Sequence, residues 1–317
     1  MKIVFIDGGL GNQVFQYIFY RYLQEKQTDP VYLDDRAFFY SDAHNGWEMP
    51  RVFGVKPNLL SEYFAPDVWK EILAITADKI HIIDLFKQNG LDFDVVSEND
   101  WVNYNLYNVE KTREALKIKE EYPNALTTKY NKPFVSVKAH GFHPHIAKMP
   151  GKVYYHGYWI NANYLKEIRK LILDELKFPP IEDDYNKELA EKISRPNSVI
   201  IHVRCGDYVS MGWVKKEHYK FYENSVAEIK KRVYLPEFFI FSDDPDWCSQ
   251  NLKVLGLGKN DNITFVDGNL GKNAFRDCQL MSMCRHMIFL NSTFSYLAAL
   301  LNQNKNKIVF QLRGEII

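Results

Sequence analysis

Short apolar runs alternate with longer amphipathic stretches along most of the chain. The first run, at residues 2–6, precedes a Gly-rich turn at 8–13, a helical pattern over 14–26 and a second run at 31–33. This β-α-β order predicts a parallel sheet with helices on its faces. We therefore expect an α/β protein with two Rossmann-like, doubly wound halves facing a cleft. The second half shows a helical pattern over 161–177 and apolar runs at 199–203, 238–241, 263–266, 287–290 and 308–310.

The stretch 36–150 interrupts this regularity. Helical patterns over 66–77 and 108–121 are mixed there with irregular, aromatic-rich segments. Pro144, Pro150 and Gly151 mark its end, because proline and glycine break regular elements. We expect an N-terminal domain over 1–150 and a C-terminal domain over 151–317.

Composition and charge narrow the class of protein. The 317 residues are 46% hydrophobic, and 40 Lys+Arg balance 40 Asp+Glu, which argues against nucleic-acid binding. No apolar segment approaches the ~20 residues of a membrane span, and the N-terminal run, cut by Asp7, is too short for a signal peptide. The cysteines lack zinc or C-x-x-C spacing, which predicts reduced thiols in a cytoplasmic protein. They are Cys205, Cys248, Cys278 and Cys284.

Polar residues end the apolar run at 198–203. His202 and Arg204 are two positions apart, so their side chains leave the same face of the predicted strand. Gly206 allows a turn, and Asp207 follows where the next element begins. Ligands of open α/β sheets bind at the carboxyl ends of strands, and arginine suits phosphate oxygens. This run therefore predicts a phosphate-bearing substrate, with a core histidine as the alternative for His202.

The turn at 8–13 joins the first strand to the first helix and allows three interpretations. A dinucleotide site would place Asp34 or Asp35 on a ribose, but Val14 stands where a small residue is needed. A plain turn is the second interpretation. The third is a substrate-facing loop in which the amides of Asn12 and Gln13 bind hydroxyls.

Two other strand ends carry polar residues. Asp244 and Asp246 follow the run at 238–241, and they fit a helix cap better than a divalent-metal clamp. An aspartate there could also accept hydrogen bonds from guanine. Ser292 and Thr293 follow the run at 287–290 and fit either a helix cap or a phosphate site.

Three segments, in this order, resemble glycosyltransferase family 11, the galactoside α-1,2-fucosyltransferases. GGLGNQVFQY at 8–17 resembles the family's G-G-L-G-N-Q-M-F-Q-Y, and HVRCGDY at 202–208 resembles H-x-R-R-G-D-Y. DCQLMSMCRH at 277–286, continued by NSTFS at 291–295, resembles D-x-x-L-M-S-x-C-x-H followed by N-S-T-F-S. Two further segments are also similar to the family: HNGWE at 44–48 and YHGYW at 155–159.

The resemblance implies a GT-B fold and a cytoplasmic enzyme of surface-glycan biosynthesis, with peripheral membrane association through lipid-linked glycans left open. It implies inverting, metal-independent transfer of L-fucose from GDP-β-L-fucose to the 2-hydroxyl of a terminal β-galactoside, with no cofactor. The N-terminal domain would then serve the acceptor and the C-terminal domain would bind GDP-fucose. Arg204 would neutralise the leaving phosphate. The donor residues implied are His202, Asp243, Asp244, Asn291, Ser292 and Thr293, and those facing fucose or acceptor are Gly9, Gly11, Asn12 and Gln13.

Two positions depart from the family pattern, and two other functions compete. Cys205 replaces the family's second arginine, and Ile160 replaces a glutamine after Tyr158-Trp159. Asp207 is the best-placed carboxylate for a base, although it could instead hold Arg204 in position. The competing functions are an NAD-dependent sugar-nucleotide oxidoreductase and a non-catalytic GDP-sugar-binding protein.

Overall fold

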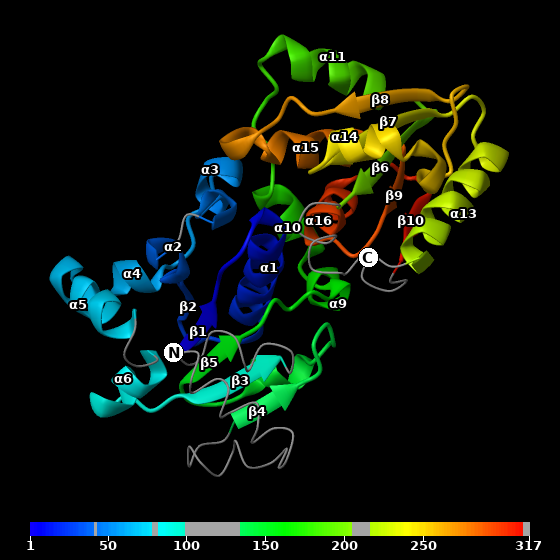
Figure 1. Ribbon diagram of the computed structural model, residues 1–317. Helices are drawn as coiled ribbons and strands as arrows, with labels where there is room; N and C mark the ends of the chain where they lie inside the picture. Colours follow the sequence, from blue (N-terminus) through cyan, green and yellow to red (C-terminus); the bar gives the residue numbers. More distant parts are fainter. Residues whose placement is uncertain (41–42, 78–81, 99–133, 205–215, 313–317) are drawn as a thin grey trace. The chain divides into compact units, whose positions relative to one another are not determined.

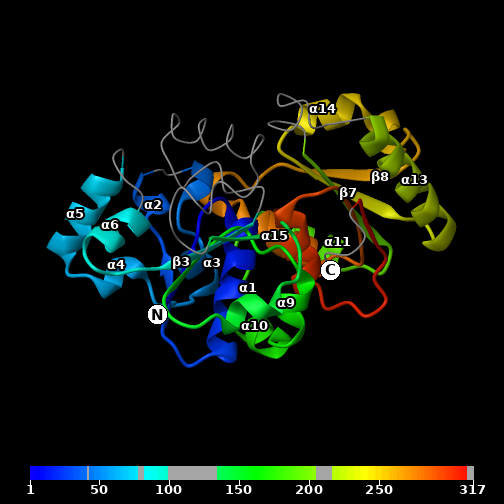
Figure 2. The ribbon, with the colours of Figure 1, turned by 90° about the horizontal axis from the view of Figure 1, so that it is seen from below.

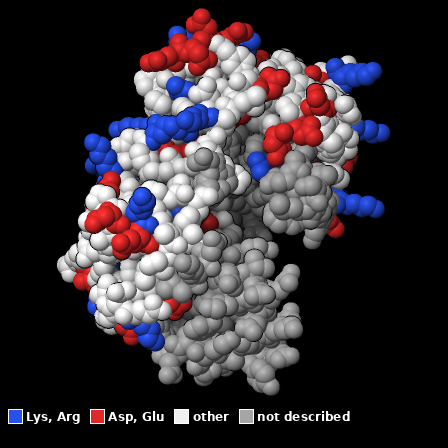
Figure 3. Space-filling view, turned by 60° about the vertical axis from the view of Figure 1, so that its left-hand side comes forward, with Lys and Arg blue, Asp and Glu red and all other residues white. Residues whose placement is uncertain are grey.

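The computed structural model describes residues 1–40, 43–77, 82–98, 134–204 and 216–312. The chain divides into two compact units, Met1–Glu175 and Leu176–Ile317, and each contains a five-stranded sheet (Figure 1). Over the described part of the chain, no helix is long and apolar enough to cross a membrane. Acidic and basic side chains are interspersed over the face drawn in Figure 3, which matches the balanced composition.

The sheet of the first unit has the strand order β2-β1-β5-β3-β4, and all its pairings are parallel. Ile3 and Phe5 of β1 pack against α4, α5 and α6 on one face, because alternate side chains of a strand point to opposite faces. On the other face Phe19 of α1 stacks on Trp159 with ring centroids 4.2 Å apart. Figure 2 shows α4–α6 apart from α1, α9 and α10. The elements are β1 Lys2–Phe5, α1 Leu10–Lys26, β2 Val31–Asp34, α2 Ala37–Tyr40, η1 Ala43–Asn45, α3 Met49–Phe53, α4 Leu60–Tyr63, α5 Pro66–Thr76, α6 Ile82–Gln88, β3 Asp94–Glu98, β4 Phe134–Val137, η2 Pro144–Lys148, β5 Val153–His156, α9 Ala162–Lys166 and α10 Arg169–Glu175.

The sheet of the second unit has the order β10-β9-β6-β7-β8, again with parallel pairings throughout. The chain starts at the central β6, runs outward to β8 and returns to β9 on the other side of β6, as in a Rossmann half. Buried residues of β6 and α13, including Ile201 and Val226, form the core of one face. The elements are α11 Asp184–Ile193, β6 Ser198–Val203, α13 Lys216–Arg232, β7 Glu237–Ser242, α14 Pro245–Gln250, η3 Leu252–Leu255, β8 Asn262–Val266, η4 Gly271–Asn273, α15 Phe275–Met283, β9 His286–Phe289, α16 Thr293–Leu301 and β10 Val309–Gln311.

The predicted fold class, two doubly wound parallel halves, is confirmed, but several element bounds differ. The first helix begins at Leu10, so the segment predicted as a turn supplies its first residues. The helix predicted over 161–177 is two short helices, α9 and α10. The helix predicted over 108–121 lies outside the described residues.

The boundary expected at residue 150 is too early. β5 pairs with β1 on one side and with β3 on the other, so the strand that follows residue 150 lies inside the first sheet. The structure places the division after Glu175 instead. β5 is an interior strand whose backbone is hydrogen-bonded on both sides, so a division between β4 and β5 would separate it from the sheet to which it belongs. Three of the four cysteines are described, and all three are buried: Cys248, Cys278 and Cys284.

Candidate functional site

Three neighbouring strands of the second unit end in the residues that the sequence singled out. β6 lies between β7 and β9, so the residues after all three strands meet at one edge of the sheet (Figure 1). The connection after β6 leads to α13 and the one after β9 leads to α16. Open α/β sheets bind ligands at the carboxyl ends of strands where the strand order reverses, which here is between β6 and β9.

Arg204 and Asp243 form an ion pair at this edge. Arg204 follows β6 and Asp243 follows β7, and Arg204 Nε lies 3.4 Å from Asp243 Oδ2. Both side chains keep part of their surface exposed, 31% for Arg204 and 26% for Asp243. A guanidinium stays charged at any physiological pH and binds phosphate oxygens well, so this edge can receive an anion from solvent.

His202 connects β6 to α16. Its side chain is buried, and its Nδ1 lies 2.5 Å from the hydroxyl oxygen of Ser295 in α16. Burial, with a smaller contribution from the positive charge of Arg204, lowers the pKa of His202 to about 4. The imidazole is therefore neutral at pH 7. His202 is buried, as the alternative of a core histidine predicted. Its hydrogen bond to Ser295 also holds the first turn of α16 beside the sheet edge that carries Arg204.

The start of α16 offers polar groups at the same edge. Ser292 is the N-cap residue, yet its side chain makes no capping hydrogen bond, and Thr293 begins the helix. The interpretation of Ser292 as a simple side-chain cap is therefore wrong. The first backbone N–H groups of a helix attract anions. Asn291 is partly used inside the fold, because its Oδ1 accepts a hydrogen bond from the Tyr296 hydroxyl at 3.4 Å.

Asp244 caps a helix. Its Oδ1 accepts the backbone N–H of Trp247 at 2.9 Å, and Pro245 follows as the first residue of α14. The cap interpretation is thus confirmed, and Asp243 is the aspartate beside Arg204. Within the described ranges, no group of three or more His, Cys, Asp or Glu side chains could hold a metal ion. Asp207, the candidate base, and Cys205 lie outside the described residues.

Gln13, expected to face fucose or acceptor, is instead part of the interior. Its side chain is fully buried. Its Nε2 donates to the carbonyl oxygens of Gly8 at 2.7 Å and Gly46 at 2.8 Å, and its Oε1 accepts the backbone N–H of Glu48 at 3.0 Å. That expectation is wrong, because α1 begins four residues earlier than predicted and turns this amide toward the segment that follows η1.

The other three residues expected to face fucose or the acceptor differ in their exposure. Gly11 is buried within α1. Gly9 is the N-cap and is partly exposed, and a Cβ placed on it would lie 3.4 Å from Cβ of His44. Asn12 is also partly exposed, and its side chain hydrogen-bonds the side chain of Tyr158. Gly9 and Asn12 therefore keep access to a ligand.

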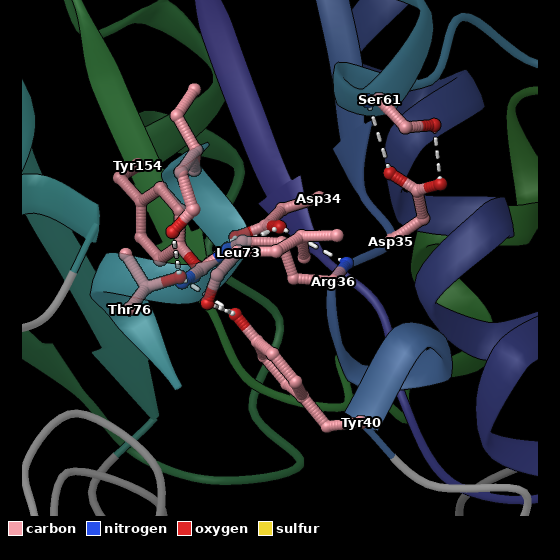
Figure 4. Close-up of polar contacts among 9 residues, drawn as sticks. Asp34, Asp35, Arg36, Tyr40, Ser61, Leu73, Thr76 and Tyr154 are labelled. Atoms are coloured by element: carbon pink, nitrogen blue, oxygen red, sulfur yellow. Dashed lines mark hydrogen bonds and ion pairs between the residues drawn. The ribbon is translucent and has the colours of Figure 1, made fainter. Parts of the chain in front are cut away.

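The aspartates that a dinucleotide site would need are used inside the fold. Figure 4 shows Arg36 and Tyr154 directed at Asp34, and Ser61 directed at Asp35. Arg36 binds Asp34 through two nitrogens at 2.8 and 2.7 Å, and the Tyr154 hydroxyl donates to it at 2.7 Å. The Ser61 hydroxyl donates to Asp35 at 2.6 Å. Since Asp34 is fully buried and Asp35 nearly so, neither carboxylate can bind a ribose, which removes the basis for the oxidoreductase alternative.

Sequence reasoning missed two residues beside the Gly-rich segment. Asp7 stands after β1 and is partly exposed, and Tyr158 stands after β5. The signal was present, since each follows a buried strand at the edge where α/β proteins bind ligands. His44, in the segment 44–48 that is similar to the family, also lies there, against Gly9.

Comparison with solved structures identifies the fold. The chain superimposes on the fucosyltransferase NodZ from Bradyrhizobium with a TM-score of 0.53 and 15% identity, covering 95% of this chain and 91% of that one. The protein therefore has a GT-B-like fold.

Sequence comparison gives the family. The signature of Glycosyl transferase family 11 matches residues 113–312, more than half of the chain, and the chain belongs to this family. It is 27% identical over 299 residues to an alpha-1,2-colitosyltransferase of Escherichia coli, covering 93% of this chain and 85% of that protein. It is also 25% identical to human galactoside alpha-(1,2)-fucosyltransferase 1 over 115 residues, which are 34% of this chain and 30% of the human protein.

Proposed function

We propose that this family 11 glycosyltransferase transfers L-fucose from GDP-β-L-fucose to the 2-hydroxyl of a terminal β-galactoside, with inversion at the fucose C1 and without a metal ion. One observation carries the proposal: Arg204, Asp243 and the start of α16 surround the carboxyl ends of β6, β7 and β9. Two relatives support it by their names, which specify alpha-1,2 transfer of colitose and alpha-(1,2) transfer of fucose to galactosides. A NodZ structure soaked with GDP-fucose shares the fold.

The proposed reaction is a single displacement. The 2-hydroxyl oxygen bonds to C1 of fucose while the bond from C1 to the phosphate oxygen breaks, and its electron pair stays on GDP. Negative charge grows on the leaving diphosphate, and Arg204 stabilises that charge together with the first N–H groups of α16. Asp243 fixes the guanidinium in place. His202 is neutral and ties the start of α16 to β6 through Ser295.

The first test substitutes Arg204. We expect Arg204→Ala to lower transfer from GDP-fucose by about 10²–10³-fold, since one preorganised contact to the transition-state charge is lost. The matched control is Arg195→Ala. Arg195 also pairs with a carboxylate of the second unit, Glu237, but at the amino end of β7. Transfer by Arg204→Ala at the wild-type rate, in a variant with an unchanged melting temperature, would remove Arg204 from the mechanism.

The second test identifies donor and linkage. Thermal unfolding with GDP, UDP and NAD added separately should show stabilisation by GDP alone, of about 2.7 kcal/mol at one hundred times its dissociation constant. Turnover of GDP-fucose and GDP-colitose, with NMR of the product, then gives the sugar and the linkage. Stabilisation by GDP without turnover of either donor would support the non-catalytic alternative, and activity that requires a divalent cation would contradict metal independence.

A further inference from the structure

The loops after β1 and β5 are held together at one edge of the first sheet. Gln16 of α1 is buried, and its Nε2 donates to Asp7 Oδ1 at 3.1 Å and to the carbonyl oxygen of Gly157 at 3.2 Å. Its Oε1 accepts the backbone N–H of Asp7 at 3.1 Å. One buried amide therefore fixes both the position and the orientation of Asp7 relative to the segment that carries Tyr158.

A strained segment covers the same edge. His44, Asn45 and Gly46 follow one another with positive φ angles of 55°, 70° and 67°, a conformation that is unfavourable for residues other than glycine. Gln13 holds this segment in place through the Gly46 carbonyl and the Glu48 N–H. His44 is exposed and lies against Gly9. Strain of this kind collects at functional sites because the surrounding structure has to maintain it.

The described acidic residues near this edge differ in exposure. Asp34, Asp35, Glu48 and Glu98 are all buried, with at most 4% of their surface exposed. Glu98 accepts three backbone N–H groups, from His140, Tyr158 and Trp159, which fixes the turns after β4 and β5. Asp7, which also stands at this edge, is instead partly exposed. Of these five described acidic residues it is therefore the one that keeps surface open to solvent.

We propose, on the basis of the proposed transfer, that Asp7 is the catalytic base of this enzyme and that His44 and Tyr158 flank the acceptor sugar beside it. As the acceptor oxygen bonds to C1 of fucose, its proton moves to a carboxylate oxygen of Asp7. The electron pair of the broken C1–O bond leaves with GDP, so charge and protons balance.

The electrostatic surroundings suit this role. Burial raises the pKa of the Asp7 carboxyl, while the Gln16 hydrogen bond and the charge of His44 limit the rise. His44 and Tyr158 are the titratable neighbours of Asp7 from η1 and from the segment after β5, and α1 contributes the uncharged Asn12 and Gln16. A base works best with a pKa nearer to the working pH. Because the carboxylate must be deprotonated, transfer should fall as the pH falls through its pKa.

The test compares wild type and Asp7→Asn in two reactions, transfer of fucose to a β-galactoside and transfer to azide. Azide attacks as an anion and needs no base, and the release of GDP reports its reaction. We expect Asp7→Asn to lower galactoside transfer by about 10²–10⁴-fold and to leave the azide reaction near the wild-type rate. The asparagine keeps an oxygen for Gln16. As a second variant, Asp7→Glu should restore part of the transfer and the loss of activity at low pH.

The matched control is Asp35→Asn, an equivalent change in a buried carboxylate near the same edge. It should leave the ratio of the two reactions unchanged. An equal fall of both reactions in Asp7→Asn, or wild-type transfer to galactoside, would overturn the proposal for Asp7 alone. Absence of fucosyl transfer to any galactoside by the wild type would overturn the proposed function itself.

Discussion

The two sheets share a parallel, five-stranded construction but carry different chemistry at their carboxyl edges. The second unit presents a charged guanidinium, Arg204, and the start of a helix, α16. The first unit presents carboxylates, amides and glycines, of which Asp7, Gly9 and Asn12 remain partly exposed. The groups of the second unit suit a diphosphate, whereas those of the first unit suit neutral hydroxyls that donate and accept hydrogen bonds.

This difference shows that topology sets where a ligand binds, while the residues at strand ends set which ligand it is. It also shows how many polar residues at or beside these edges serve the fold. In the first unit Asp34, Gln13 and Glu98 are buried and bonded internally. In the second unit Asp244 caps α14. The predictions below separate these structural residues from those proposed to meet substrate.

The largest effect on stability is expected from Asp34→Asn. The substitution leaves the buried Arg36 guanidinium without its carboxylate, and breaking a buried ion pair in this way costs about 3–5 kcal/mol. Urea denaturation measures the change. The control Glu167→Gln, which removes the more exposed pair with Lys26, should leave the free energy of unfolding nearly unchanged. Equal small losses in both variants would mean that the Asp34 network contributes little to the first unit.

A smaller loss is expected from Gln13→Met. The thioether fills similar space but removes the partner of the Gly8 and Gly46 carbonyls and of the Glu48 N–H. We expect a total loss of about 1–3 kcal/mol, the cost of a buried polar group left unpaired. Because Gln13 holds the segment with His44, we also expect the KM for the acceptor to rise while stabilisation by GDP is kept. Loss of GDP binding with an unchanged acceptor KM would contradict the division of roles between the two edges.

The sequence predicted the second unit better than the first for a physical reason. The central strands β6, β7 and β9 of the second unit are buried on both faces, so they appear as apolar runs with β-branched and aromatic residues, such as Val199–Val203. In the first unit, β3 begins with Asp94 and ends with Glu98, and β5 ends with His156. These polar ends interrupt the apolar pattern, so the sequence did not predict β3 and β5 as strands. Because β5 was not predicted, the expected domain boundary fell before it, at residue 150.

The candidate site, like the fold, could be predicted only in part from the sequence. The family resemblance implied that Arg204 and Asp243 both meet the donor, and the structure brings them together because β6 and β7 are neighbouring parallel strands that end at one edge. The role of Gln13 could not be predicted, because an amide suits a ligand and an internal hydrogen bond equally well. Its partners Gly46 and Glu48 are distant along the chain, and no local pattern indicates contacts of that range.

The smallest effect on stability is expected from a buried histidine. Each unit has one near the end of a strand. Burial lowers the pKa of His156 in β5 and of His202 in β6 to about 4. The unfolded chain titrates near 6.5, so the unfolded state binds more protons between these values and stability is lost as the pH falls from 6.5 toward 4. Neither ring nitrogen of His156 has a hydrogen-bond partner among the described residues, whereas His202 contacts Ser295. We expect His156→Phe to reduce the difference in free energy of unfolding between pH 7 and pH 5, as measured by urea denaturation, without changing GDP binding. An unchanged difference would show that His156 does not contribute to the acid sensitivity of the fold.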